Sequence, residues 1–193
     1  MPRTKAFDQQ DVLQKAVALF WKQGYEATSM QDLVDHLGIS RSSLYETFGD
    51  KENLYKQALK AYRDQGTHRL ENQWNPDKTF TQNLRALFNA VIQEADLDPE
   101  AKGCFLVNAG IELAHTQPDV FNQVKENQEN TIAFFKRKII EAKLANQLPG
   151  KQHATELAAL VYNSYAGLQV LARSKSDTNT MKNAVSALLD LLE

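Results

Sequence analysis

One short apolar segment carries side chains that could do chemistry. It covers residues 103–115 and reads GCFLVNAGIELAH. At helical spacing, Cys104, Asn108 and His115 fall on one side of this segment, and Glu112 lies beside them. A thiol, a carboxylate and an imidazole can serve as nucleophile, proton carrier or ligand-binding group. Because the rest of the segment is apolar almost all round, it predicts a buried central helix.

An enzyme with a cysteine–histidine pair is one hypothesis for these residues. Cys104 and His115 lie eleven residues apart on one helix, so roughly 16 Å separates them, which is beyond hydrogen-bond reach. The other histidines, His36, His68 and His153, do not have the spacing of metal ligands. The sequence also lacks a phosphate-binding loop and a paired-carboxylate motif. We therefore expect a protein that is not an enzyme and needs no metal or cofactor.

The thiol of Cys104 has two interpretations. A free cysteine is most often a small buried apolar side chain. Cys104, however, opens the predicted helix and stands close to Lys102 in the sequence. A helix N-terminus and a nearby cation both lower the pKa of a thiol, and a thiolate reacts readily. A sensor of oxidants or electrophiles is therefore the alternative hypothesis for this residue.

The carboxylate of Glu112 also has two interpretations, because a buried carboxylate needs a partner. Neighbouring helices could supply that partner. Alternatively, the polar groups of the segment could line a ligand pocket whose remaining walls are apolar. The second hypothesis predicts an effector-binding site built from Tyr62, Phe88, Cys104, Phe105, Asn108, Glu112 and Phe134.

An earlier stretch, SMQDLVDHLGISRSSLYETFGDK, predicts a pair of short helices. Ser29 can cap the first helix together with an acidic residue three positions on, and Gly38 can end it in a left-handed backbone conformation. Ser40 can cap the second helix, which Gly49 ends. A helix, a glycine-containing turn and a second short helix form a helix-turn-helix, whose second helix enters the major groove of DNA. An ordinary helical hairpin would show the same turn.

Polar side chains mark the face of this unit that would meet DNA. Arginine is the commonest specific reader of guanine, while hydroxyl groups and the free amides of a helix N-terminus suit phosphate. Lys51 stands in the first turn of the next helix, where a cation is unfavourable unless an anion lies beside it. The predicted DNA-binding residues are Thr28, Ser29, Ser40, Arg41, Ser42, Ser43, Tyr45, Thr47 and Lys51.

The residues around these helices form a longer pattern, T-S-M-x-x-L-V-x-x-L-G-I-S-R-S-S-L-Y-x-x-F-x-x-K-E-x-L. It runs from Thr28 to Leu54 and follows a Gly24-Tyr25 pair. This pattern resembles the DNA-binding signature of the TetR family of bacterial transcriptional regulators. The resemblance covers the first quarter of the chain, and it favours a DNA-binding unit over an ordinary hairpin. The Gly-Cys pair at residue 103 also resembles a subgroup of TetR-type repressors that sense oxidants or electrophiles.

The resemblance implies an architecture and a function. It implies an all-α chain of about nine helices, with a helix-turn-helix DNA-binding domain in residues 1–50 and a ligand-binding and dimerisation domain in residues 51–193. It also implies a homodimeric repressor that a small-molecule inducer releases from a palindromic operator in double-stranded DNA. In such proteins the matching lysine, here Lys51, contacts phosphate. A helical interaction module that does not bind DNA remains the alternative.

The composition agrees with a globular helical protein. The formal net charge is −2, so DNA binding must rest on a few placed contacts rather than on a basic surface. A single cysteine fits a reducing compartment, and no apolar run approaches the roughly 20 residues needed to span a bilayer. The sequence therefore predicts a cytoplasmic protein without a membrane partner.

The last two predicted helices, separated from the preceding one by Pro149-Gly150, are strongly apolar. In TetR-like proteins such helices form a four-helix dimer interface, which here would use Leu157, Leu160, Leu168, Leu171, Leu188 and Leu192. Alternatively, these leucines only close the core of one chain.

Overall fold

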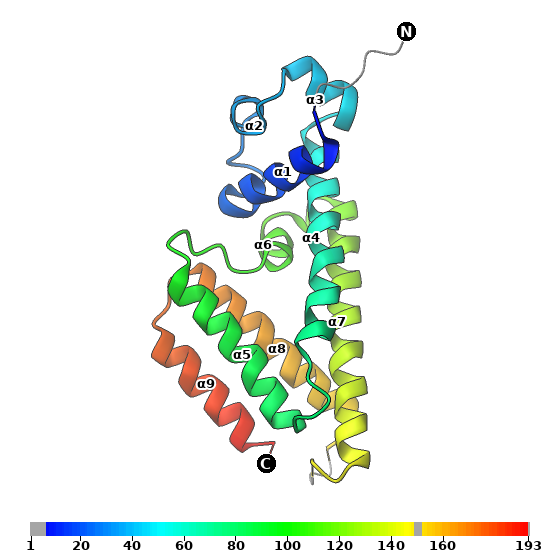
Figure 1. Cartoon of the computed structure of the whole chain (residues 1–193), viewed down its shortest axis with the longest axis vertical. Helices are drawn as coiled ribbons and strands as arrows, with labels where there is room; N and C mark the ends of the chain where they lie inside the picture. The colour runs from blue at the N-terminus through cyan, green and yellow to red at the C-terminus, as the bar shows by residue number, and fades with distance from the viewer. Residues whose placement is uncertain (1–6, 149–151, 193) are drawn as a thin grey trace.

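The computed structural model describes residues 7–148 and 152–192, apart from the side chains of Thr67 and His68. In this part of the chain every regular element is a helix (Figure 1). The nine described helices are α1 Gln9–Gln23, α2 Met30–Leu37, α3 Arg41–Phe48, α4 Lys51–Gln73, α5 Phe80–Leu97, α6 Phe105–Leu113, α7 Pro118–Leu144, α8 Ala154–Arg173 and α9 Thr178–Asp190. The all-α prediction is confirmed, whereas the predicted break at Pro149-Gly150 lies outside the described residues.

The helices are arranged along one long axis. Figure 1 shows α1, α2 and α3 at one end and the bundle of α5, α8 and α9 at the other. The long helices α4 and α7 run side by side between the two ends, and α6 lies in the middle. None of the described helices is long and apolar enough to cross a membrane.

The predicted caps of the first short helices are present. The Ser29 hydroxyl accepts a hydrogen bond from the amide of Asp32 at 3.1 Å, and the Asp32 carboxylate accepts one from the amide of Ser29 at 2.8 Å. Gly38 ends α2 at φ 68°, a left-handed conformation that glycine adopts at little cost. The Ser40 hydroxyl caps α3 by accepting from the amide of Ser43. These contacts fix the turn between α2 and α3.

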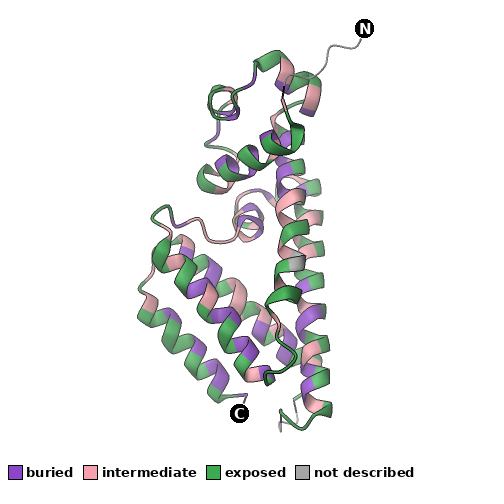
Figure 2. Ribbon diagram, viewed as in Figure 1, coloured by how far each residue is buried: buried purple, intermediate pink, exposed green. Residues whose placement is uncertain are grey.

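Buried apolar side chains form two separate cores (Figure 2). The first core joins α1, α2 and α3 to the first half of α4 and to apolar residues of α6, including Phe20, Leu33, Leu44, Tyr55 and Phe105. It therefore extends beyond residue 50, where we expected the first domain to end.

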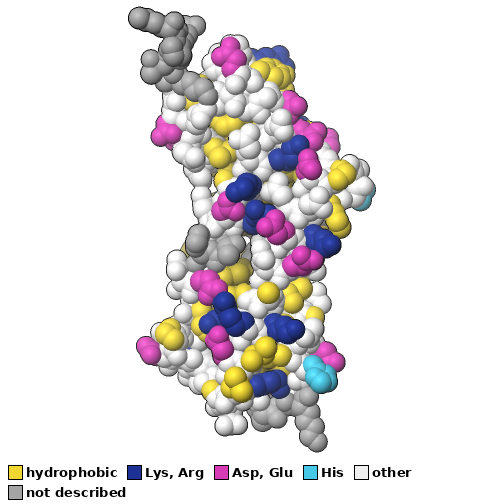
Figure 3. Space-filling model, turned by 90° about the vertical axis from the view of Figure 1, so that its right-hand side faces the viewer, with side chains coloured by type: hydrophobic (Ala, Val, Ile, Leu, Met, Phe, Trp, Pro, Cys, Tyr) yellow, Lys and Arg dark blue, Asp and Glu magenta, His cyan; other side chains and the backbone are white. Residues whose placement is uncertain are grey.

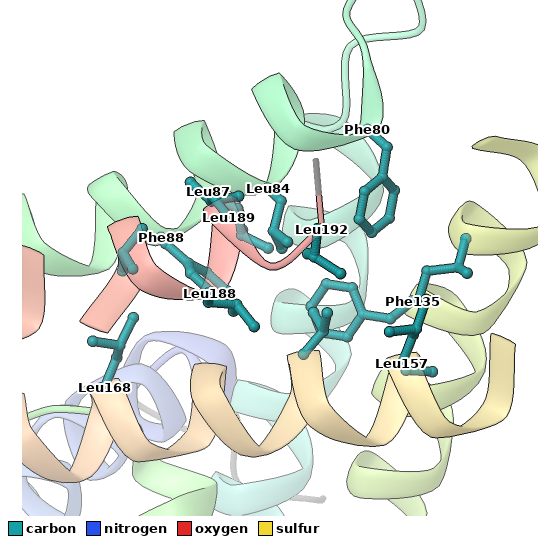
Figure 4. Close-up of a cluster of buried hydrophobic side chains, with 14 of the residues drawn as sticks. Phe80, Leu84, Leu87, Phe88, Phe135, Leu157, Leu168, Leu188, Leu189 and Leu192 are labelled. Carbon is teal, nitrogen blue, oxygen red and sulfur yellow. The ribbon is translucent and has the colours of Figure 1, made fainter. Parts of the chain in front are cut away.

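The second core lies within the C-terminal bundle. Figure 4 shows Leu188 and Leu189 of α9 pointing into the space between α5 and α8. Four of the predicted interface leucines belong to this core and are almost completely buried: Leu157, Leu168, Leu188 and Leu192. Because these side chains close the core of their own chain, they are not available to a second copy.

One predicted helix differs from our expectation. We expected a central helix over residues 103–115 that is buried all round, but α6 is shorter, and Cys104 precedes it as the N-cap. The side chain of Ile111 is 67% exposed, so α6 buries only one side. On α7, Phe121 is 47% exposed, whereas its neighbour Val120 is buried.

Candidate nucleic-acid interface and ligand cavity

The polar face predicted to meet DNA lies at the far end of the molecule, on α2 and α3 (Figure 1). Ser29, Ser40, Arg41 and Ser42 are exposed there, and the ring of Tyr45 is also exposed. Ser43 and Thr47 are partly buried. The inward side of α3 is apolar because Leu44 and Phe48 are buried in the first core. The amphipathic pattern of α3 thus leaves most of the predicted reading side chains open to a partner.

Thr28 is placed differently from the other predicted DNA-binding residues. It is completely buried, and its hydroxyl donates a hydrogen bond to the carbonyl oxygen of Gly24 at 2.6 Å. This bond connects the turn before α2 to the end of α1. The Thr28 hydroxyl is therefore turned away from the surface on which Ser29 lies.

Lys51 lies over the aromatic ring of Tyr25, with 4.2 Å between its ammonium nitrogen and the ring centroid. Hydrogen bonds from the hydroxyl and the amide of Ser29 lower the pKa of Asp32, and the charge of Lys51 acts in the same direction. Lys51 thus stands beside the N-terminus of α2, where the free amides and a nearby cation favour an anion. On the face shown in Figure 3, basic and acidic side chains are interspersed.

A cavity of about 770 Å³ lies in the middle of the molecule. Its walls come from α1, α4, α5, α7 and α8 and from the residues around the start of α6. Of the predicted effector-binding residues, Tyr62, Cys104 and Phe134 line this cavity. The structure therefore brings together three of the seven.

The other four predicted residues lie behind the cavity wall or beside it. Phe88 stacks on Tyr165, and Phe105 packs edge-on against Tyr62, so both rings support residues of the lining. The side-chain amide of Asn108 donates to the carbonyl oxygen of Lys102 at 2.8 Å. Glu112 faces the DNA-binding end.

The carboxylate of Glu112 bonds to the turn between α1 and α2. It accepts hydrogen bonds from the backbone amides of Tyr25 at 3.1 Å and Glu26 at 2.8 Å. Gly24 precedes this pair at φ 85°, and a Cβ atom there would lie 2.9 Å from the carboxylate. This partly buried acid thus has the partner that one of our two interpretations required, and that partner belongs to the DNA-binding end.

Two further side chains connect the end of α1 to the rest of the chain. The indole N–H of Trp21 donates to the carbonyl oxygen of Gly103 at 3.0 Å. Arg173, at the end of α8, donates to the carbonyl oxygen of Lys22 at 3.1 Å. Together with the bonds of Glu112, these contacts form what we call the α1 junction.

Trp21 is a cavity residue that the sequence analysis missed. Val17 and Trp21 lie four positions apart on α1, so they share one side of the helix, and both line the cavity. Two apolar residues at this spacing were the available signal. The helix that braces the DNA-binding unit is therefore also a wall of the cavity.

The environment of Cys104 opposes a reactive thiolate. Burial raises the pKa of this thiol and outweighs the hydrogen bonds from Val107 and Tyr62 that act in the opposite direction. Lys102, which we expected to lower the pKa, forms ion pairs with Asp98 at 3.0 Å and Glu100 at 3.2 Å. The expectation of a lowered pKa is wrong because burial of the thiol dominates and the nearby cation is paired with other acids. The thiol-sensing alternative is therefore not favoured.

The α2–α3 unit on a helical body with an internal cavity defines the molecule as a helix-turn-helix regulator. The sequence model described as "Bacterial regulatory proteins, tetR family" matches residues 12–58, and the one described as "Tetracyclin repressor-like, C-terminal domain" matches residues 80–188. The chain therefore belongs to the TetR family of bacterial regulatory proteins, as its sequence pattern predicted. It is a DNA-binding transcriptional regulator and not an enzyme.

Known relatives agree over the full length. The chain is 30% identical to the uncharacterized HTH-type transcriptional regulator YezE of Bacillus subtilis (strain 168), with all of both chains covered. It is 29% identical to the HTH-type transcriptional repressor ComR of Escherichia coli (strain K12), covering 98% of this chain and 90% of ComR. A structure of a cysteine mutant of the TetR family regulator CifR, in complex with operator DNA, has a TM-score of 0.85 at 24% identity and covers 99% of this chain and 100% of that one.

Proposed function

We propose that this protein is a dimeric, cytoplasmic repressor that binds a palindromic operator in double-stranded DNA and releases it when an effector fills the central cavity. The observation that carries the proposal is the exposed polar side of α3, connected to the cavity by the single continuous helix α4. The repressor name of ComR and the operator complex of CifR support the same function.

The dimer explains why the operator should be a palindrome. TetR-family regulators are dimers, and two identical helix-turn-helix units related by twofold symmetry present α3 twice. Such units read half-sites about 34–36 Å apart, or at a multiple of one helical turn of DNA. In this chain, Leu160, Val170 and Leu191 are large apolar side chains exposed on α8 and just after α9. We assign the dimer contact to this outer face.

The effector response depends on α4 and α1. Helix α4 carries Lys51 at its start and Tyr62 in the cavity wall, while α1 carries Trp21 in the same wall. A ligand can shift a two-state equilibrium only if it binds one arrangement better than the other. A weakening of operator binding by about 100-fold corresponds to about 2.7 kcal/mol of coupling, which is within the usual range.

The test is a gel-shift titration with the full-length protein and the DNA upstream of its own coding region. We expect a retarded complex on the intact palindrome and much weaker binding when one half-site is scrambled. Sedimentation of the free protein should show a dimer. Equal binding to intact and fully scrambled DNA would contradict the proposal, and the absence of any retarded complex would favour a helical interaction module that does not bind DNA.

A further inference from the structure

The ring-bearing walls of the cavity indicate the shape of its ligand. Trp21, Tyr62, Phe134 and Tyr165 line it, and they come from α1, α4, α7 and α8. The rings of Trp21 and Tyr62 pack edge-on against each other, with 5.0 Å between their centroids. Aromatic walls favour flat aromatic ligands, which can stack on one ring and meet another at its edge. A volume of about 770 Å³ is within the range of cavities that enclose a drug-sized molecule.

The charged groups of the wall are balanced. Two arginines and two glutamates line the cavity, and they pair with each other. Arg69 lies 3.7 Å from Glu94, and Arg137 forms an ion pair with Glu71. All four side chains are about half exposed to solvent, so an anionic ligand would gain little by displacing a glutamate from its arginine. The rest of the described lining offers a ligand no charged partner.

A cationic ligand would also meet occupied partners. Positive charges bind well over the faces of aromatic rings, but two rings of this wall already have a cation of the protein nearby. Arg137 lies 5.6 Å from the centroid of Phe134, and Lys102 lies 5.6 Å from that of Trp21. The phenols do not supply negative charge, since burial raises the pKa of Tyr62 and of Tyr165 well above the usual range.

Neutral polar groups remain available for a ligand. The amide side chains of Gln14, Gln65 and Asn130 line the cavity, and amides can both donate and accept hydrogen bonds. Deeper in the wall, Gln169 is hydrogen-bonded to the hydroxyl of Tyr165. The lining thus combines flat apolar surfaces with uncharged hydrogen-bonding groups.

We propose that the cavity binds an uncharged, planar aromatic molecule that carries hydrogen-bonding groups. This inference rests on the proposed function insofar as it treats the cavity as the effector site. It goes further because it excludes the ionic ligand classes through the paired charges and occupied rings of the wall.

The test uses three pyrene derivatives that share one ring system and differ in charge: the carboxamide, the carboxylate and the methylammonium. Binding to the full-length protein is followed by the fluorescence anisotropy of pyrene. We expect the neutral carboxamide to bind at least about tenfold more tightly than either charged derivative, because each charge must be desolvated without a free partner. A charged derivative that binds as tightly as the carboxamide would overturn the proposal.

Three variants locate the binding and test its cause. Ala90→Trp fills the cavity from α5 and should abolish carboxamide binding, whereas Ala86→Trp, one turn earlier on the exposed side of α5, should leave it unchanged. Glu94→Gln removes the partner of Arg69 and should move the preference toward the carboxylate by up to about fivefold, since the pair is exposed. Carboxamide binding that is unchanged in Ala90→Trp would contradict the assignment of the ligand to this cavity. An unchanged preference between the derivatives in Glu94→Gln would contradict the role given to the paired charges.

The operator gel shift of the same protein samples separates this inference from the proposed function. Carboxamide binding without any effect on operator binding would support the ligand class but count against the effector role of the cavity. If the protein binds the operator but prefers a charged pyrene derivative, the repressor function would be supported and the proposal of an uncharged ligand would be overturned.

Discussion

The two cores of this protein differ in how they are built from the sequence. The C-terminal core is formed within one bundle, in which α5, α7, α8 and α9 pack large apolar side chains such as Phe88 and Phe135 against each other (Figure 4). The first core joins the DNA-binding helices to α6, which lies far along the sequence. The cavity lies between the two, since Val17 and Leu106 come from the first core and Leu87 and Phe134 from the second.

This difference shows where the molecule can change shape. Across the cavity the two cores are connected by the long helices α4 and α7 and by the hydrogen bond from Arg173 of α8 to the carbonyl oxygen of Lys22 at the end of α1. Packed cores resist deformation, whereas a few hydrogen bonds can be exchanged at modest cost. We infer that the C-terminal bundle is the fixed base and that the DNA-binding end reorients on it.

The largest effect is expected from damage to the C-terminal core. Phe135 is completely buried there, and Phe135→Ala should lower the free energy of unfolding by about 3–5 kcal/mol because it leaves a cavity. Urea unfolding followed by circular dichroism measures this loss. Phe121→Ala removes the same ring from an exposed position of the same helix and should change stability by less than about 0.5 kcal/mol. Similar losses for both variants would show that the buried face of α7 is assigned wrongly.

The next effect concerns DNA recognition at the other end. Arg41→Ala should cost about 1–3 kcal/mol of operator binding and relax the sequence preference, because we predict that this exposed arginine reads a base. Lys51→Ala should weaken binding to all DNA sequences alike and reduce the salt dependence of the affinity, as expected for a phosphate contact. Binding titrations on the operator and on scrambled DNA at several salt concentrations separate the two roles. If Lys51→Ala altered the preference and Arg41→Ala did not, the roles would be reversed.

The α1 junction should give a smaller, local effect. In Glu112→Gln, an NH2 group that cannot accept a hydrogen bond replaces one carboxylate oxygen. The backbone N–H of Tyr25 or Glu26 then loses its acceptor, which should cost about 1–2 kcal/mol. We expect faster hydrogen exchange in the turn between α1 and α2, with protection of the C-terminal bundle unchanged. Exchange measured by mass spectrometry on peptides from both ends provides the comparison.

The matched control is Glu129→Gln on α7, whose carboxylate lies 3.8 Å from exposed Lys125. An exposed ion pair contributes little to stability, so the amide hydrogens of this variant should exchange at the same rates as those of the parent protein. Faster hydrogen exchange at both ends of Glu112→Gln would mean that the α1 junction stabilises the whole fold instead of orienting one end.

The DNA-binding end could be predicted in detail because its signals are local. Capping by Ser29 and Ser40 and the left-handed Gly38 depend on residues within one turn, so the sequence alone locates both short helices. The cavity was harder to predict. Periodicity shows that α8 and α9 have apolar faces, but it does not show whether the same chain or a second copy covers them, and Leu168 and Leu188 proved to be internal.

The partners of the polar residues could not be predicted either, because they come from distant parts of the sequence or depend on tertiary contacts. Glu112 binds backbone amides more than eighty residues earlier in the chain, and backbone amides have no sequence signature. Cys104 was judged from its sequence neighbour Lys102, whose charge is neutralised by acids of its own loop. Predicting either would require the tertiary contacts themselves.

The smallest effect on DNA binding is expected at Cys104, and it sharpens the contrast between a cavity wall and a reactive site. Burial raises the pKa of this thiol above its ordinary value of 9.0, so the proton stays bound below that pH and is lost only at higher pH than for a free thiol. Alkylation of the native protein by iodoacetamide at pH 8 should therefore be slower than alkylation in urea, where the thiol has its ordinary pKa. For the same reason the contribution of this group to stability is complete below pH 9.0 and is lost as the pH rises through the raised value. Cys104→Ser should keep operator affinity and effector release close to those of the parent protein. Rapid alkylation of the folded protein at pH 8, together with loss of effector release in Cys104→Ser, would instead show that the thiol is the sensor.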